Sequence, residues 1–137
     1  MTDRVLVDTS VAIPLLVASH DAHEIVLSWA TGRELGLAGH ALVETYSVLT
    51  RLPGDARVLP GDAVELIDEN FGERVSLSPQ VAEQAHRFLA TTGIAGGATY
   101  DGLVALAARE AGAMLATRDA RARSTYEAVG VRVLLVA

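Results

Sequence analysis

The sequence predicts a three-layer α/β/α fold, in which helices cover both faces of a parallel β-sheet. Short, continuous apolar segments alternate along the chain with longer segments of helical periodicity. Strands that are apolar on both faces belong to parallel sheets that are buried on both sides. The length of 137 residues is typical of one domain, and no linker, internal repeat or low-complexity tract divides the chain. We therefore expect residues 1–137 to form a single domain.

The first part of the chain is expected to alternate twice between strand and helix. Residues 4–7 form a short apolar run that fits a buried strand, and an apolar helical segment that contains Pro14 follows it. Residues 22–30 have helical periodicity, and Gly32 just beyond them suits the end of a helix. The second strand is expected over residues 35–38.

The middle of the chain is expected to contain two helices and one strand. The first helix covers residues 41–52 and is ended by Pro53, and the second covers residues 60–70. Residues 75–77, with two apolar side chains, are the best match to the third strand.

The remaining segments continue the alternation of helix and strand. Ser78 and Pro79 supply an N-cap and a first-turn proline for a helix that extends to residue 89. A glycine-rich loop at residues 93–97 separates it from the next helix. We then expect a helix over residues 99–111, a strand over 113–116, a helix over 120–129 and a strand over 131–136.

Two residue types are absent, and each absence excludes classes of function. Without cysteine, the chain cannot form disulfides, zinc–thiolate sites, iron–sulfur clusters or cysteine nucleophiles. Without lysine, it lacks the residue on which Walker-type phosphate loops, Schiff-base enzymes and receiver domains depend. No apolar stretch is long enough to span a membrane and no signal peptide is recognisable, so a cytoplasmic location is expected.

The formal net charge of −6 argues at first against a nucleic-acid partner. This argument weakens if some carboxylates are metal ligands, because setting aside four of the seventeen acids leaves thirteen against eleven arginines. The placement of individual arginines therefore matters more than the total. Three arginines near the C-terminus can bind phosphates through bidentate hydrogen bonds, or can form a solvated helix face with ion pairs: Arg118, Arg121 and Arg123.

Three aspartates stand at or near predicted helix starts: Asp8, Asp101 and Asp119. Each alone is explained as a helix cap, which stabilises a helix by about 0.5–2 kcal/mol. Asp8 and Asp119 also follow strands of the predicted sheet, and parallel sheets bind ligands at the carboxyl ends of their strands. Together, the three aspartates predict a cluster of acids at one edge of the sheet.

Such a cluster has a chemical consequence. Two carboxylates about 4 Å apart repel each other by roughly 4 kcal/mol at an effective dielectric constant of 20, so the cluster either takes up protons or holds a cation. Oxygen ligands favour a hard ion such as Mg²⁺, with Mn²⁺ as a substitute. An ion of this kind polarises a phosphate and orients a water nucleophile, which indicates phosphodiester hydrolysis. Because it relieves repulsion, Asp8→Asn is expected to leave the metal-free protein at least as stable as the wild type.

Glu44 lies inside a predicted helix, and periodicity alone describes it as a solvated glutamate. The expected buried face of this helix is formed by Leu42, Tyr46 and Leu49, and Glu44 lies roughly opposite. Nothing in the residue pattern by itself separates Glu44 from the other glutamates of the chain.

Several polar residues have two interpretations each. Ser10 and Thr117 either orient metal ligands and phosphate or make local hydrogen bonds near helix starts. His20 and His23 are one helical turn apart and are interpreted as surface histidines in preference to ligands or bases, because an acidic site requires neither.

Four segments, taken together and in this order, resemble the PIN-domain family. They are VLVDTS at residues 5–10, HALVETY at 40–46, the Tyr100-Asp101 pair at a helix start, and ATRD at 116–119. Within the family, the chain is similar to the VapC toxins of bacterial type II toxin–antitoxin systems, and the resemblance extends over essentially the whole chain.

The resemblance implies a parallel sheet of about five strands and a Mg²⁺ site. Four acids stand at the family's acidic positions: Asp8, Glu44, Asp101 and Asp119. Asp8 and Asp101 are similar to the direct ligands, while Glu44 and Asp119 complete the site or act through water.

The resemblance also implies an activity and partners. Family members are metal-dependent endoribonucleases that cut single-stranded or looped RNA, often tRNA or ribosomal RNA. They are homodimers silenced by a VapB-type antitoxin, whose C-terminal segment fills the groove beside the site. Ser10 and Thr117 match supporting polar positions of relatives.

Two other functions are compatible with parts of the pattern. A haloacid-dehalogenase-like phosphatase also begins with a strand and an aspartate, but it needs a second aspartate where this chain has Ser10, and usually a lysine. A PIN-fold protein that binds RNA or a partner without cleavage is the stronger alternative, and the complete set of acids argues against it.

Overall fold

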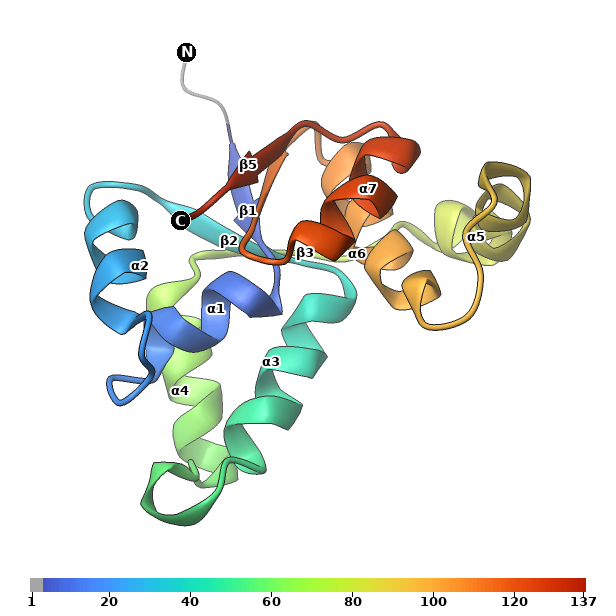
Figure 1. Ribbon diagram of the computed structural model, residues 1–137. Helices are drawn as coiled ribbons and strands as arrows, with labels where there is room; N and C mark the ends of the chain where they lie inside the picture. Colours follow the sequence, from blue (N-terminus) through green and yellow to red (C-terminus); the bar gives the residue numbers. More distant parts are fainter. Residues whose placement is uncertain (1–3) are drawn as a thin grey trace.

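The computed structural model describes residues 4–137 and contains a five-stranded sheet in the order β3-β2-β1-β4-β5 (Figure 1). The strands are β1 (Val5–Val7), β2 (Leu35–Ala38), β3 (Glu73–Val75), β4 (Met114–Thr117) and β5 (Val133–Leu135). Every neighbouring pair is parallel. Helices cover the sheet on both faces, so the predicted three-layer α/β/α fold with a parallel sheet of five strands is confirmed.

The central strands end level with one another at one edge of the sheet. Val7, the last residue of β1, pairs with Leu37 of β2 and with Ala116 of β4. The amide of Asp8 then donates to the carbonyl of Ala116 at 3.2 Å, which brings the residue after β1 against the end of β4. Because parallel strands point in one direction, the residues that follow these strands gather at the same edge.

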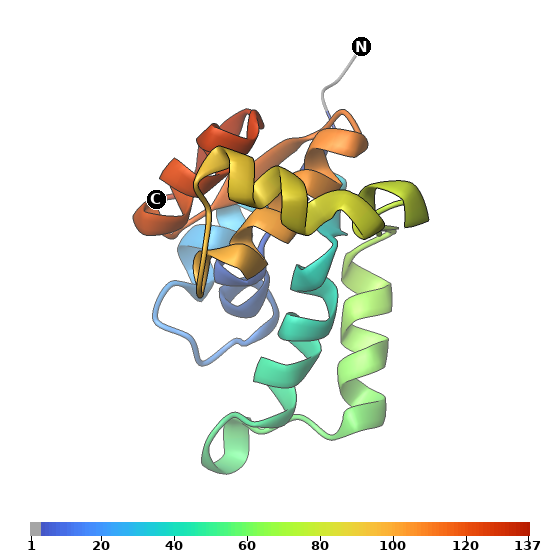
Figure 2. The ribbon, with the colours of Figure 1, turned by 90° about the vertical axis from the view of Figure 1, so that its right-hand side faces the viewer.

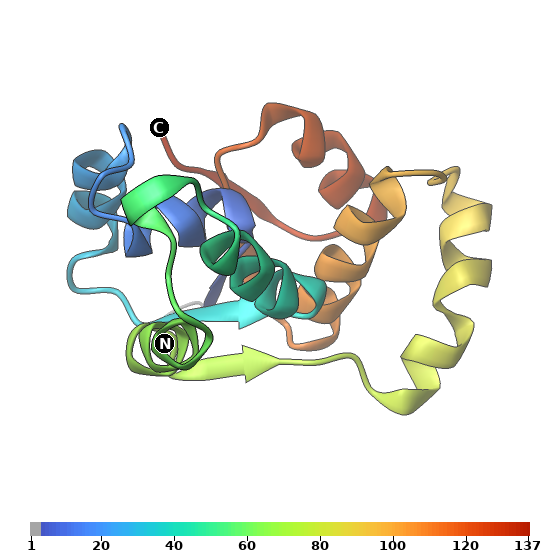
Figure 3. The same cartoon turned by 90° about the horizontal axis from the view of Figure 1, so that it is seen from below.

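The sheet is surrounded by helices joined through short loops. Their bounds are α1 (Thr9–Leu16), α2 (His23–Ala30), α3 (His40–Thr50), the short 3-10 helix η1 (Gly54–Ala56), α4 (Pro60–Asn70), α5 (Pro79–Thr92), α6 (Ala98–Glu110) and α7 (Ala120–Val129). Figure 2 shows α3 and α4 side by side, projecting from the sheet and connected through η1. Figure 3 shows α5 beside α6, at a distance from the strands. Within residues 4–137, no helix is both long and apolar enough to cross a membrane.

The core confirms the expectation that the apolar strands are buried on both faces of the sheet. Leu6, Val7, Leu37 and Leu115, from the three central strands, are fully buried. Phe71, the residue that ends α4, is larger than these four side chains and is also completely buried. Burying these side chains supplies the main favourable free energy of folding, at about 25 cal/mol per Å² of apolar surface.

The predicted position of the third strand is wrong by two residues. The strand covers Glu73–Val75 in place of residues 75–77. β3 lies at the edge of the sheet, and its residues Glu73 and Arg74 are exposed. An edge strand is not buried on both faces, so a search for apolar runs does not detect its polar part.

The predicted end of the helix after Pro79 is also wrong, because α5 continues three residues beyond residue 89, to Thr92. The Thr92 hydroxyl donates to the carbonyl of Phe88 at 2.8 Å within the last turn. Gly93 ends the helix with a φ of 81°, a left-handed conformation that glycine adopts without a steric penalty.

Candidate functional site

Asp8 lies at the N-terminus of α1, directly after the central strand. Its Oδ1 atom accepts the amide of Ser10 at 3.0 Å and the hydroxyl of Ser10 at 2.6 Å. The carboxylate is only 5% exposed. Burial raises the pKa of Asp8, and hydrogen bonds from the neighbouring hydroxyls counteract part of this effect. Asp8 is therefore a helix cap, as the simpler interpretation expects, and it is also a buried carboxylate held in one orientation.

Tyr126 contacts the other oxygen of the same carboxylate. The Tyr126 hydroxyl donates to Oδ2 of Asp8 at 2.7 Å, and the tyrosine is 1% exposed. Burial and the charge of Asp8 raise the pKa of Tyr126 far above its ordinary value, so the hydroxyl keeps its proton and remains a donor. Tyr126 is not predicted from the sequence, because an aromatic side chain within a helix is ordinarily explained by core packing and nothing local indicates its partner.

Ser10 and Thr117 connect the loop after β1 with the end of β4. The two hydroxyl oxygens are 3.2 Å apart. Ser10 Oγ also accepts the amide of Arg118 at 2.8 Å, and Thr117 Oγ1 accepts the amide of Asp119 at 3.0 Å. The local hydrogen bonds of the first interpretation are therefore present, and through Ser10 they also orient Asp8. At position 10 the chain has a hydroxyl that orients Asp8, where a haloacid-dehalogenase-like phosphatase would need a second carboxylate.

Asp119 caps α7 as Asp8 caps α1. Its Oδ1 atom accepts the amide of Arg121 at 2.9 Å, and its side chain is 42% exposed. Because Thr117 binds the Asp119 amide, the position of this aspartate is set by the same hydroxyl pair that lies beside Asp8.

Asp101, in the first turn of α6, shows that the acids lie near one another. Its pKa is raised first by burial and then by the negative charges of three further carboxylates: Asp8, Asp119 and Glu44. His40 acts in the opposite direction and lowers the pKa of Asp101. The four acids come from four separate helices, so only the tertiary structure brings their charges together.

Glu44 lies on α3, with its side chain 44% exposed and Oε2 3.9 Å from Nε2 of His40. The fully buried residues of α3 are Ala41, Thr45 and Leu49, and the predicted Leu42 and Tyr46 are partly buried and pack against the core. The reason is that α3 contacts α1, α4 and α6, so the packing neighbours determine which stripe is covered. Glu44 precedes the buried Thr45 in the sequence and is itself exposed. Its negative charge contributes to the raised pKa of Asp101.

His40 and Tyr100 form an aromatic pair beside these acids. Their ring centroids are 4.9 Å apart with an interplanar angle of 27°, and Tyr100 is 54% exposed. His20 and His23, the two histidines considered from the sequence, are interpreted there as surface residues. These two bind local backbone, since His20 accepts the amide of Ala22 and His23 Nδ1 lies 2.8 Å from the carbonyl of Pro14.

The four acids supply hard oxygen ligands, but their side chains are not arranged as a complete coordination site. Within the described part of the chain, no three His, Asp or Glu side chains are grouped closely enough to hold an ion as they stand. The donor set nevertheless fits Mg²⁺ or Mn²⁺ chemically, because carboxylates are the ligands these ions prefer. Burial and then repulsion from the other acids raise the pKa of Asp101, and a bound cation relieves that repulsion.

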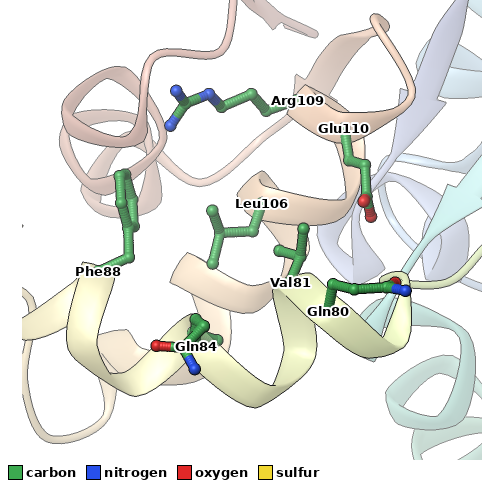
Figure 4. Close-up of a pocket in the computed structure, with 8 residues that line it drawn as sticks. Gln80, Val81, Gln84, Phe88, Leu106, Arg109 and Glu110 are labelled. Atoms are coloured by element: carbon green, nitrogen blue, oxygen red, sulfur yellow. The ribbon is translucent and has the colours of Figure 1, made fainter.

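The two cavities described lie away from the acids. One, of about 500 Å³, is a groove between α5 and α6, lined among others by Val81, Phe88, Leu106 and Arg109 (Figure 4). The other, of about 590 Å³, lies beside η1 and α4. None of the four acids lines either cavity. Three of those acids are partly exposed at the sheet edge, which suits contact with a polymer more than enclosure of a small molecule.

The three C-terminal arginines differ in their surroundings. Arg123 forms an ion pair within α7, in which its Nε donates to Glu127 at 2.6 Å. Arg121 is 98% exposed beside Asp119. Arg118 is partly buried, and among residues 4–137 its Nε has no hydrogen-bond partner. The solvated helix face with ion pairs therefore describes Arg121, which pairs with Asp119 at 3.9 Å, and Arg123, while the Arg118 side chain makes no hydrogen bond or ion pair within residues 4–137.

The chain is similar to proteins of known family along its whole length. Residues 5–128 match the PIN domain. The chain is 56% identical over 137 residues to Ribonuclease VapC27 of Mycobacterium tuberculosis, covering 100% of both chains. It is 42% identical to Ribonuclease VapC40 of Mycobacterium tuberculosis over 130 residues, covering 94% of this chain and 96% of the relative.

Solved structures share the fold at lower sequence identity. FitAB bound to an IR36 DNA fragment has a TM-score of 0.69 at 21% identity, with 96% of this chain and 94% of that chain covered. DNA-bound VapBC from Salmonella typhimurium has a TM-score of 0.66 at 18% identity, with 99% and 100% covered. VapC20 of Mycobacterium tuberculosis, a sarcin-ricin loop cleaving toxin, has a TM-score of 0.66 at 20% identity, with 93% and 95% covered. With its five-stranded parallel sheet and its match to the PIN domain, this chain belongs to the PIN-domain family and is a relative of the VapC ribonucleases.

Proposed function

We propose that this protein is a metal-dependent endoribonuclease toxin that cleaves RNA phosphodiester bonds at the acidic edge of its sheet. The observation that carries the proposal is the position of Asp8 and Asp119 after two adjacent strands, connected through the Ser10–Thr117 hydroxyl pair, with Asp101 close enough for burial and the charges of Asp8, Asp119 and Glu44 to raise its pKa. Gathering four like charges opposes folding, and a bound divalent cation removes that penalty. The 56% identity to a protein named as a ribonuclease supports the same activity.

The four acids are the proposed metal ligands and catalytic residues. Asp8 and Asp101 bind Mg²⁺, or Mn²⁺ as a substitute, and Glu44 and Asp119 complete the site or act through water. The ion, when bound, polarises the phosphate, orients the attacking water and stabilises the leaving oxygen. The chain contributes orientation: Ser10 holds Oδ1 of Asp8 through two hydrogen bonds and connects it with the end of β4.

RNA binding requires cations near the site despite the net charge of −6. Arg118 and Arg121 are the proposed phosphate contacts because they stand on either side of Asp119 and keep free donors. Arg123 contributes less, because its guanidinium is already paired with Glu127. Single-stranded or looped RNA, such as tRNA or ribosomal RNA, is the proposed substrate class, and a sarcin-ricin loop cleaving toxin shares the fold.

The proposed regulation follows from the complexes with which the fold is shared. FitAB and VapBC structures contain this fold together with a second protein and DNA. A VapB-type antitoxin is therefore the proposed inhibitor, and a homodimer the proposed form of the toxin. Adding such an antitoxin in stoichiometric amount is expected to stop cleavage.

The test is cleavage of total tRNA and of ribosomal RNA by antitoxin-free protein, in Mg²⁺, in Mn²⁺ and in EDTA. Discrete fragments are expected with either ion and none with EDTA. Asp8→Asn is expected to remove cleavage, while Asp62→Asn, which changes an exposed acid on α4, serves as the matched control and keeps it. Binding of RNA without fragments, by folded and metal-loaded protein, would favour the alternative of a PIN-fold protein that binds without cutting.

A further inference from the structure

The hydrogen bond between Tyr126 and Asp8 assigns a role to a residue outside the proposed ligand set. We infer that Tyr126 is a positioning residue: it fixes the Asp8 carboxylate so that Oδ2, which accepts one hydrogen bond where Oδ1 accepts two, is the oxygen presented to the cation. The inference rests on the proposed function, because it concerns the same metal site. It adds which oxygen of Asp8 binds and which buried side chain holds it in place.

The first step is a count of hydrogen bonds on the Asp8 carboxylate. A carboxylate offers about four acceptor positions, two on each oxygen. Oδ1 receives both the amide and the hydroxyl of Ser10, at 3.0 and 2.6 Å. Oδ2 receives the hydroxyl of Tyr126 at 2.7 Å. Oδ1 therefore accepts two of these bonds and Oδ2 one, and the Thr117 hydroxyl also lies close enough to lower the pKa of Asp8, so Oδ2 is the oxygen with more room for a cation.

The second step concerns rigidity. Asp8 and Tyr126 are 5% and 1% exposed, so water does not compete for their hydrogen bond. Donors on both oxygens prevent the carboxylate from rotating about its last bond. Without the tyrosine hydroxyl, Oδ2 would lose this hydrogen bond and the carboxylate would be held mainly through Oδ1. Groups that orient a metal ligand in this way typically change metal affinity by about 10- to 100-fold when they are removed.

The third step concerns the element that carries Tyr126. α7 begins at its cap Asp119 and bears Tyr126 two turns later. One helix therefore sets the position of Asp119 through its N-terminus and the orientation of Asp8 through its buried face. A tyrosine that only filled the core would make this connection by chance, and phenylalanine would serve that purpose equally well.

The experiment compares Mn²⁺ binding by antitoxin-free wild type, Y126F and Y46F in isothermal titration calorimetry. Y126F removes one oxygen atom, and its dissociation constant for Mn²⁺ is expected to rise about tenfold or more. Y46F is the matched control, because Tyr46 is partly buried and its hydroxyl bonds to nothing within residues 4–137, so its affinity is expected to stay within twofold. Equal affinity of folded Y126F and wild type would overturn the inference.

A second measurement needs no variant at Tyr126. In a crystal structure of the wild type with Mn²⁺, the ion is expected to contact Asp8 through Oδ2 only, with the Tyr126 hydrogen bond retained. Contact through Oδ1, contact through both oxygens, or loss of the tyrosine contact would overturn the inference.

The two proposals fail in different ways. Mn²⁺ binding that Asp8→Asn and Y126F both weaken, in a protein that cleaves no RNA, would leave the role of Tyr126 standing and overturn the nuclease. RNA cleavage by the wild type, with unchanged Mn²⁺ affinity in Y126F, would leave the nuclease standing and overturn the role of Tyr126. A wild type without Asp8-dependent Mn²⁺ binding would overturn both.

Discussion

Burial and, after it, the negative charge of Asp8 raise the pKa of Asp101, although Asp8 caps α1 and Asp101 lies in the first turn of α6. The two carboxylates differ in their hydrogen bonds. Asp8 accepts three, whereas Asp101 makes none among the described residues. Asp8 therefore combines repulsion with stabilising hydrogen bonds, whereas Asp101 experiences repulsion without them, so mutation of each residue can separate the two effects.

Asp101→Asn is expected to raise the melting temperature of the protein in EDTA. A raised pKa means that the ionised group destabilises the fold at neutral pH, and that this penalty disappears as the pH falls through the raised pKa. Removing one screened like charge is worth roughly 1 kcal/mol, or about 2–4 °C for a domain somewhat larger than 100 residues. Melting curves of both proteins between pH 7 and pH 4 should converge at low pH; a constant difference would contradict the explanation.

Asp8→Asn is expected to lower the melting temperature in EDTA, which reverses the expectation from the sequence. An amide has only one acceptor oxygen, so it cannot satisfy both Ser10 and Tyr126, and a buried donor or acceptor is left without a partner. Such a loss typically costs about 1–3 kcal/mol, which exceeds the relief of repulsion. Thermal unfolding followed by circular dichroism measures the shift, and an unchanged or higher melting temperature would show that repulsion dominates at Asp8.

Thr45→Val is expected to stabilise the protein without affecting RNA cleavage. Thr45 is fully buried on α3, and within residues 4–137 its hydroxyl has no hydrogen-bond partner. Valine has nearly the same shape and removes the unpaired group, so the free energy of unfolding should rise by about 1 kcal/mol. A urea titration should show a higher midpoint at unchanged slope. A lower midpoint would mean that a water molecule satisfies this hydroxyl.

Glu110→Gln is expected to weaken the attachment of α5 at neutral pH but not in acid. The carboxylate of Glu110 accepts the amide of Ser78 at 2.8 Å and the Ser78 hydroxyl at 2.5 Å, and these bonds lower the pKa of Glu110. A lowered pKa stabilises the fold above the ordinary carboxyl pKa, and the contribution is lost as the pH falls through the lowered value. Hydrogen exchange of α5 amides should differ between variant and wild type at pH 7 and agree at pH 3.

Arg118→Ala is expected to weaken RNA binding more than Arg123→Ala. Within residues 4–137 the Arg118 side chain makes no hydrogen bond or ion pair, whereas Arg123 is paired with Glu127. Loss of one phosphate contact should reduce the slope of log affinity against log salt by about 0.7 for a single strand. KM measured at several salt concentrations tests this, with Arg123→Ala as the matched control. Equal slopes for both variants would remove Arg118 from the RNA contacts.

Most of the fold was predictable because its signals are local. A buried strand such as β1 is a continuous apolar run, and a helix such as α5 begins with a serine cap and a proline, so short windows of sequence are sufficient. β3 was misplaced because its pairing at the sheet edge leaves Glu73 and Arg74 exposed, and no periodicity marks such a strand.

By itself, the sequence determined that three aspartates stand at helix starts and that two of them follow strands of one parallel sheet. Resemblance to the PIN-domain family added Glu44, which periodicity placed in solvent. Only the tertiary structure decided that the charges of these acids act on Asp101, and that Tyr126 holds Asp8. The physical reason is range: caps and apolar runs involve neighbours in the chain, whereas a hydrogen bond between a helix near the C-terminus and the end of the first strand depends on how the helices pack on the sheet.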